Sequence, residues 1–363
     1  MMIDAFVESL LSGLDSLVEY LSQHVVTCLV PAFFIAGAIA AFIKKDAILE
    51  YLGPRAKKRV SYPLASVSGT SLAVCSCTIL PIFAGLYKKG SGIGPATAFL
   101  CAGPAINMLA IAYTAQVLGY DLGLARAVPA VGSSIVVGLL MATIFTSHDR
   151  NGSENLSAKA AVLPDSRPDG RLKLKWALPA LFVALIAILV VAASGLDILL
   201  RLALVVLLTA VVIALVLLYL HRDEMTDWGY ETWDLTKKIL PILMLGTFVI
   251  GVIAYFLPPE TFRPYLGGNS LESVFLASVL GSVLYMPTLL EVPIIGTTFG
   301  YTSGVIGGGP ALALLLSGPT VSLPSVAVLY RIVGARKTAA YVVIVLLISA
   351  LSGFIYGNLT GGG

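Results

Sequence analysis

Residues 61–87 read SYPLASVSGTSLAVCSCTILPIFAGLY, an apolar stretch that is interrupted by glycine, proline and polar residues. Arg59 precedes this stretch and Lys88 follows it, each beside further lysines. Because lysine and arginine favour the cytoplasmic side of a membrane, both ends of the stretch are predicted to lie on that side. We therefore expect residues 61–87 to enter the membrane and return as a broken-helix hairpin instead of crossing it.

The composition of the 363-residue chain places this hairpin in a membrane protein with many spans. Hydrophobic residues make up 58% of the chain and charged residues only 12%, which is about half the charged share of soluble proteins. Apolar blocks long enough to cross a hydrocarbon core of about 30 Å recur along the chain. Eight spans are predicted, at residues 25–43, 93–118, 126–146, 176–195, 198–220, 238–257, 307–330 and 338–356. The predicted fold is an all-α polytopic membrane protein with eight spans and two re-entrant hairpins, or with ten spans if both hairpins cross.

One membrane domain with four parts is expected. Residues 1–22 place apolar side chains at helical spacing with acids between them, which is typical of an amphipathic interfacial helix. A first transmembrane repeat follows at 25–146, then a cytoplasmic loop with two linking transmembrane helices at 147–236, and a second transmembrane repeat at 238–357. The positions of the basic loops place both termini outside.

The two transmembrane repeats share their glycine and proline positions. A second interrupted apolar stretch, residues 273–302, resembles the first hairpin. The matching positions are Gly94-Pro95-Ala96 with Gly309-Pro310-Ala311, Gly103-Pro104 with Gly318-Pro319, and Gly69 and Pro81 with Gly281 and Pro293. Loop charges start the first repeat outside and the second inside, so the repeats are predicted to be inverted. Inverted repeats with broken helices are typical of secondary transporters, and the alternative is a duplicated scaffold with no transport role.

The pair Cys75 and Cys77, with Ser76 between them, lies midway along the first hairpin and shortly before Pro81. Two closely spaced sulfur ligands suit one soft metal or metalloid ion. The same pair could cycle between dithiol and disulfide, or the cysteines could simply be small buried residues. Cys101, on the next span, would add a third thiolate if its helix faces the hairpin.

Three further candidates are polar or ionisable residues within apolar segments. Asn107 and Ser322 occupy matching positions in the two repeats, where they either flank a shared substrate site or hydrogen-bond between helices for packing. Glu291, two residues before Pro293, is the only charged residue between Ser273 and Tyr330. An ionisable group at membrane depth indicates function, here in transport or proton coupling. The alternative is that Glu291 lies near one face of the membrane and pairs with an arginine or lysine.

Other function classes find no support in the sequence. The glycine-rich strings at 90–94 and 304–309 lack the ending of a phosphate-binding loop, and no catalytic triad or zinc-protease motif is present. The basic residues are spread over several loops, so no nucleic-acid interface is expected. We expect no enzymatic activity and no cofactor. The expected partners are a small solute and the lipid bilayer; a homo-oligomer is possible, and no soluble partner is indicated.

The string Cys75-Ser76-Cys77-Thr78-Ile79-Leu80-Pro81, then Lys88-Lys89-Gly90, then the G-P-A-x-N string ending at Asn107, resembles the ArsP/YraQ-type predicted permease family. The resemblance implies a multi-pass permease of the prokaryotic inner membrane, in a family whose characterised members export trivalent arsenicals, including methylated forms. It also implies that Cys75 and Cys77 bind a thiophilic substrate and that Asn107 shapes the pathway. Thr78 departs from the pattern, because many members have glycine there.

The predicted function is that of a permease of the plasma membrane, a secondary transporter that works by alternating access between its two halves. Glu291 would carry a coupled proton. The expected substrate-binding residues are Cys75, Ser76, Cys77, Pro81, Cys101, Asn107, Glu291, Pro293 and Ser322. Two alternatives remain, a membrane thiol–disulfide redox protein that uses Cys75 and Cys77, and a channel-like facilitator.

Overall fold

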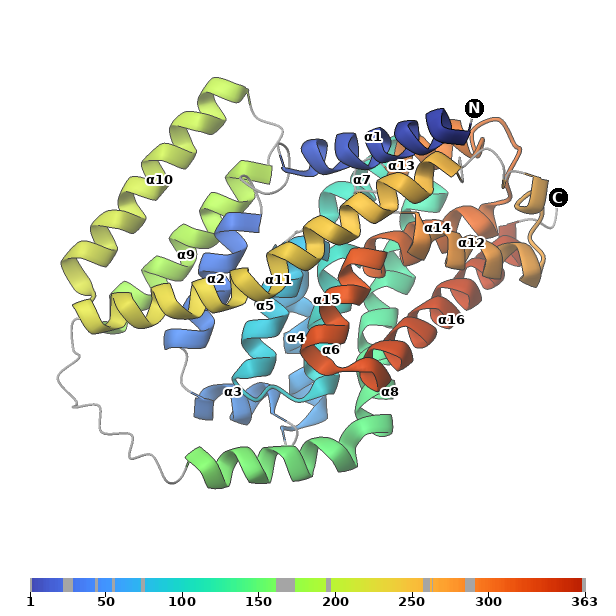
Figure 1. Ribbon diagram of the computed structural model, residues 1–363. Coiled ribbons are helices and arrows are strands. Elements are labelled where there is room, and N and C mark those ends of the chain that lie inside the picture. The colour runs from blue at the N-terminus through green and yellow to red at the C-terminus, as the bar shows by residue number, and fades with distance from the viewer. Residues whose placement is uncertain are drawn as a thin grey trace.

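The computed structural model describes residues 2–21, 29–42, 45–53, 56–72, 76–160, 174–193, 197–256, 262, 264–284 and 291–360, and the regular elements in these ranges are all helical. In chain order they are α1 (Met2–Tyr20), α2 (Val30–Phe42), α3 (Lys45–Leu52), α4 (Lys58–Leu72), α5 (Ser76–Lys88), α6 (Ile93–Ala105), α7 (Met108–Val117), α8 (Tyr120–Ala160), α9 (Leu174–Ala193), α10 (Ile198–Tyr219), α11 (Arg222–Phe256), α12 (Leu271–Val283), α13 (Glu291–Pro293), the π-helical turn η3 (Ile294–Thr298), α14 (Gly308–Thr320), α15 (Leu323–Val333) and α16 (Ala335–Thr360). Figure 1 shows their arrangement.

The described helices confirm the prediction of an all-α polytopic membrane protein. Four helical stretches are long and apolar enough to cross a membrane, namely Ile93–Val117, Tyr120–Phe145, Leu199–Tyr219 and Ala335–Thr360. The pair α14 and α15, bent by 46°, makes a fifth if it counts as one span. Shorter apolar helices cover parts of the other predicted spans and hairpins. The number of spans and the re-entry of the hairpins stay predictions.

Several helices expose apolar side chains to their surroundings. Leu199 on α10 is 79% exposed, and Val128 on α8 and Leu351 on α16 are also exposed. Single exposed apolar residues are ordinary in soluble proteins, but continuous apolar faces this extensive are not. These faces are the surfaces that lipid would cover.

Helix α11 organises the outer part of the molecule. It packs against α2, where the Trp228 indole donates a hydrogen bond of 2.9 Å to the Phe34 carbonyl. The amphipathic helix α1 lies along the second part of α11 (Figure 1), and Ser12 Oγ donates to the Gly251 carbonyl at 3.0 Å. The contact with α11 accounts for part of the apolar face of α1, and the interfacial position of that helix stays a prediction. Helix α9 packs on α2, and α10 packs on α9.

Corresponding helices of the two transmembrane repeats begin at a constant spacing in the chain. Helices α6, α7 and α8 begin at Ile93, Met108 and Tyr120, and α14, α15 and α16 begin 215 residues later in each case. Packing follows the same order, because α6 contacts α4 and α8 while α14 contacts α12 and α16. The glycine and proline pattern that suggested a repeat therefore coincides with matched helix boundaries. The opposite orientation of the two units across a membrane stays a prediction.

Glycines allow the same close approach in both units. A Cβ at Gly94 on α6 would lie 2.9 Å from the Gly138 carbonyl oxygen on α8. A Cβ at Gly309 on α14 would lie 2.8 Å from the Gly353 carbonyl oxygen on α16, at the equivalent position. Both distances are too short for any side chain, so glycine is required for these helix pairs to pack as they do.

The two units also contact one another reciprocally. In the second unit, α13 contacts α7 of the first; in the first unit, α5 contacts α15 of the second. Helices α6 and α14 meet, as do α8 and α16. Reciprocal contacts of this kind are the pattern expected if the two units are related by a local two-fold axis, a relation that stays a prediction. The candidate functional site lies at the contact between α13 and α7.

Candidate functional site

A buried ion pair joins the two units at the contact between α13 and the first unit. Glu291 begins α13 and Arg126 lies on α8; the side chains of both are 0% exposed. Arg126 Nη2 lies 2.5 Å from Glu291 Oε1. Helix α13 is followed directly by the π-helical turn η3, an irregularity that is often found at functional sites. The sequence left two hypotheses for Glu291, a role in transport or a pairing with an arginine or lysine near one face of the membrane. The structure shows the pairing with an arginine, and both side chains are fully buried.

Threonine and glycine complete the surroundings of this pair. Arg126 Nη1 donates a hydrogen bond of 2.9 Å to Thr114 Oγ1 on α7, and Thr114 Oγ1 donates to the Ala110 carbonyl at 2.7 Å. Gly318 on α14 presents its backbone to the carboxylate, since a Cβ there would lie 3.6 Å from Glu291 Oε2. We call Thr114, Arg126 and Glu291 the polar centre. Helices α7, α8 and α13 supply these three residues, and α14 packs its backbone against them at Gly318.

Two polar atoms at the polar centre have no hydrogen-bond partner among the residues that the structure describes. They are Glu291 Oε2 and Arg126 Nε. A buried polar group without a partner costs about 1–3 kcal/mol, and more if it is charged. Such groups call for a functional explanation or for an additional bound species. The polar centre therefore has spare capacity to bind a proton, an ion or a polar solute.

The equivalent location in the other half of the molecule is apolar. The repeat offsets map Thr114 to Leu329 and Arg126 to Tyr341, both 215 residues later, and map Glu291 to Ile79, 212 residues earlier. All three equivalents are buried in one hydrophobic cluster, and Ile79 packs against Gly103 as Glu291 packs against Gly318. Packing is thus satisfied at this kind of contact by two aliphatic residues and a tyrosine, whose hydroxyl donates a hydrogen bond of 3.3 Å to the Thr320 carbonyl. The charges of the polar centre are therefore not required by the architecture.

Asn107 and Ser322 lie at the breaks between α6 and α7 and between α14 and α15, and both are buried. Asn107 Oδ1 accepts a hydrogen bond of 3.4 Å from the Ala110 backbone N–H, three residues on. The Ser322 backbone N–H donates to Ser325 Oγ at 2.9 Å. Both contacts are of the kind that caps a helix N-terminus. The structure therefore brings the two residues to matching positions and engages each in the turn that restarts its helix.

The predicted sulfur ligands are only partly described. Cys75 lies outside the described residues; Ser76 and Cys77 begin α5, and their side chains are not described. Cys101 on α6 is buried beside Ser133 of α8 and Thr320 of α14, with which it lines a cavity of about 10 Å³. Cys101 therefore lies between the two units, in space too small for a ligand. Among described residues, no group of three histidine, cysteine or acidic side chains forms a metal site.

Of the two predicted proline sites, Pro81 is buried within α5 and Pro293 is half-buried at the end of α13. Pro293 lies two residues after Glu291, so the second hairpin does bring these two predicted site residues together. The polar centre spans both units, because Thr114 and Arg126 belong to the first and Glu291 to the second.

Arg126 and Thr114 are the site residues that the sequence reasoning missed. Arg126 and Asp121 are the only charged residues between Lys89 and Asp149, so the rule that selected Glu291 applies equally to Arg126. The predicted span, 126–146, began at Arg126, and a charged residue at the end of a span is expected to lie at the membrane surface. Helix α8 begins six residues earlier, at Tyr120, and places Arg126 inside the protein. Thr114 carries no such signal, because threonine is common in membrane helices.

The fold and the polar centre define a polytopic membrane protein with a buried charge pair between two related helical units. Comparison with known proteins identifies the group: residues 10–358 match the family described as "Predicted permease", and the chain belongs to this family. It is 38% identical to the UPF0718 protein MJ0584 of Methanocaldococcus jannaschii over 95% of this chain and 94% of that protein. It is 24% identical to the UPF0718 protein YraQ of Escherichia coli K12 over 90% of this chain and 74% of that protein. No solved structure matches the chain.

Membership in this family confirms the resemblance that the cysteine and G-P-A-x-N strings indicated. The family supports a membrane permease, which is a class of transporter.

Proposed function

We propose that this protein is a secondary transporter that exports a small thiophilic solute, such as a trivalent arsenical, across the prokaryotic plasma membrane, and that the Arg126–Glu291 pair couples export to a proton. The observation that carries the proposal is the fully buried ion pair between the two units. A transporter that works by alternating access must change the contacts between its units in each cycle. The pair lies at one of those contacts.

The ion pair restricts how that contact can open. Separating Arg126 from Glu291 inside the protein would leave two buried charges without partners, which costs several kcal/mol. Opening is therefore favoured only if water enters or if Glu291 becomes neutral. A proton taken up on its carboxylate removes the negative charge and weakens the hold on Arg126. Proton binding and the opening of the contact would then be linked, and linkage of this kind is reciprocal.

The thiol part of the site would come from the first hairpin. Cys75 and Cys77 precede Ile79, which is fully buried against Gly103 at the end of α6. The two cysteines thus lie just before the contact of Ile79 with Gly103, which is the first-unit equivalent of the contact of Glu291 with Gly318. Thiolates are suitable ligands for a soft metalloid, so one unit would contribute the sulfur ligands and the other the proton-binding carboxylate.

Flux into proteoliposomes tests the coupling. Purified protein would be assayed with methylarsenite and with arsenite, with and without an imposed pH gradient. We expect the gradient to alter flux in the parent protein and in Glu272→Gln, a control at an exposed glutamate on α12. Glu291→Gln should make flux insensitive to the gradient. Gradient-dependent flux that survives in Glu291→Gln would overturn the coupling role, and gradient-independent flux in the parent protein would indicate a facilitator.

Cysteine variants test the cargo separately. The double variant Cys75→Ser, Cys77→Ser should lose arsenical flux and retain the fold, judged by its elution as a single species. Undiminished arsenical flux in that variant would exclude thiol ligation of the cargo. If the cysteine variant loses arsenical flux while Glu291→Gln loses only the sensitivity of flux to the pH gradient, the cysteines bind the cargo and Glu291 acts in coupling.

A further inference from the structure

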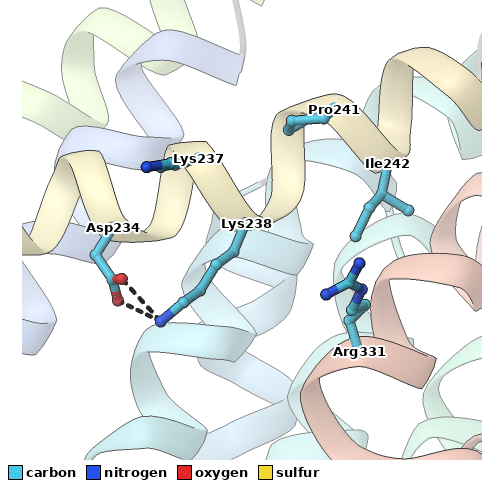
Figure 2. A pocket seen from close by; sticks show the side chains of 6 residues that line it. All are labelled: Asp234, Lys237, Lys238, Pro241, Ile242 and Arg331. Atoms are coloured by element: carbon cyan, nitrogen blue, oxygen red, sulfur yellow. Dashed lines mark hydrogen bonds and ion pairs between the residues drawn. The ribbon is translucent and has the colours of Figure 1, made fainter.

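A recess of about 390 Å³ lies between α11 and α15 (Figure 2), and none of its lining residues belongs to the polar centre. Its lining residues are Asp234, Lys237, Lys238, Pro241, Ile242 and Arg331. Three cationic side chains and one carboxylate leave this surface with a net positive charge. The described structure thus holds a basic recess that the transport proposal does not use.

The single carboxylate is already engaged. Asp234 lies 2.8 Å from Lys238 Nζ, as Figure 2 shows, and 3.3 Å from Lys88 Nζ at the end of α5. Lys237 and Arg331, in contrast, have no ionic partner among the residues that the structure describes. Two cations at the recess are therefore available for an anionic ligand.

The recess lies where both helices change from charged to apolar. Lys238 is the last charged residue of α11, and α15 carries no charge before Arg331 in its last turn. Exposed aromatic side chains occur at the same level: Trp233 is 66% exposed and Tyr330 is 59% exposed. Tryptophan and tyrosine with exposed rings are enriched at the boundary between headgroups and hydrocarbon. Lysine and arginine favour the cytoplasmic side of a membrane, and Lys237, Lys238 and Arg331 all line the recess.

We propose that this recess binds the phosphodiester headgroup of an anionic phospholipid of the cytoplasmic leaflet. Arg331 supplies a planar guanidinium, which matches phosphate oxygens in a bidentate manner, and Lys237 adds a second charge. Pro241 and Ile242 offer an apolar surface to the glycerol and the first methylene groups. Basic pockets between membrane helices on this side are a general means of holding anionic headgroups. The same phosphate chemistry would admit free phosphate, which the experiment distinguishes.

The test is lipid binding to the purified full-length protein in detergent, measured by native mass spectrometry with phosphatidylglycerol and with phosphatidylcholine. We expect the parent protein to prefer phosphatidylglycerol. The double variant Lys237→Gln, Arg331→Gln should lose that preference by about 30-fold, from the contributions of two basic residues near a membrane surface. The double variant Lys58→Gln, Arg336→Gln removes two exposed charges elsewhere and should keep the preference.

Two further measurements make each outcome decisive. The charge-preserving variant Lys237→Arg, which leaves the Arg331 guanidinium in place, should retain phosphatidylglycerol binding and so separates the loss of charge from a loss of folding. If the Lys58→Gln, Arg336→Gln control loses the preference for phosphatidylglycerol as strongly as the recess variant does, the preference depends on general surface charge. That result would overturn the proposal. Displacement of phosphatidylglycerol by inorganic phosphate at equal concentration would overturn the lipid assignment in favour of a free anion.

Discussion

Exchanging the residues of the polar centre for those at the equivalent apolar location separates its structural role from its functional one. The triple variant Thr114→Leu, Arg126→Tyr, Glu291→Ile installs the side chains that stand at positions 329, 341 and 79. In the native protein those side chains are buried in a hydrophobic cluster. The exchange therefore installs residues that this architecture already buries at the equivalent positions.

The expected magnitudes follow from the complete burial of both charges. Removing one partner of a buried ion pair leaves the other charge uncompensated and destabilises by about 3–5 kcal/mol. Replacing the whole pair by apolar residues of similar volume is often neutral or stabilising, by up to about 4 kcal/mol. Imperfect packing of the new side chains would cost about 1–3 kcal/mol. We therefore expect Arg126→Tyr alone to lower the free energy of unfolding by about 3–5 kcal/mol and the triple variant to lie within about 3 kcal/mol of the parent.

The free energy of unfolding would be measured by titration with a denaturing detergent in mixed micelles, and flux would be measured in proteoliposomes. We expect the triple variant to be more stable than Arg126→Tyr but inactive in proton-coupled transport. A triple variant no more stable than the single variant would show that the charges are not coupled as the 2.5 Å contact implies. A stable triple variant with full coupled flux would show that the polar centre has no role in transport.

Three further predictions concern other parts of the structure. Gly138→Ala on α8 should destabilise by about 1–3 kcal/mol, because its Cβ would lie 2.8 Å from a carbonyl oxygen of α6; Gly132→Ala, on the same helix with open space around it, should be neutral or stabilising by about 0.5–1 kcal/mol in thermal unfolding. The hydrogen bond from Lys238 holds the pKa of Asp234 below its ordinary value. The contact therefore stabilises the fold above the unfolded-state pKa of Asp234, and this stability is lost as the pH falls through the folded-state pKa. Asp234→Asn lacks this contribution, so its unfolding midpoint should fall less than that of the parent between about pH 5 and pH 3. Asn107→Ala should cost about 1 kcal/mol in the same assay through loss of the cap on α7, while Asn107→Ser should retain most of that stability.

Much of the fold follows from patterns that are local in the chain. The glycine and proline positions predicted matched helix breaks, and the helices beginning at Ile93 and Gly308 bear out that correspondence. Glycine and proline act through backbone geometry, which depends little on distant residues. Helix ends were less predictable: α8 extends from Tyr120 to Ala160, well beyond the predicted span of 126–146. Charged residues can continue a helix past the membrane, so hydropathy marks the apolar part and not the end of the helix.

The site was harder to predict because its pairing is a tertiary event. Glu291 was identified by its isolation in an apolar stretch, but nothing local to Glu291 identifies Arg126, which lies 165 positions away in the chain. Asn107 and Ser322 were identified as equivalent polar residues, and their hydrogen bonds place them as caps beside the helix breaks. The role of Cys75 and Cys77 stays a prediction, since their side chains lie outside the described part of the chain.

The polar centre breaks the equivalence of two otherwise matched units, and this asymmetry has a consequence for mechanism. Two units with the same contacts would exchange places between inward-open and outward-open states at nearly equal free energy, because each state would mirror the other. Here one inter-unit contact holds Arg126 and Glu291, and its counterpart holds Ile79, Leu329 and Tyr341. In the proposed mechanism, opening the first contact would depend on charge, and opening the second would depend on exposing largely apolar surface. Protonation of one carboxylate would then change the free energy of only one of the two opening movements, and in this way a proton gradient would impose a direction on a nearly symmetric scaffold.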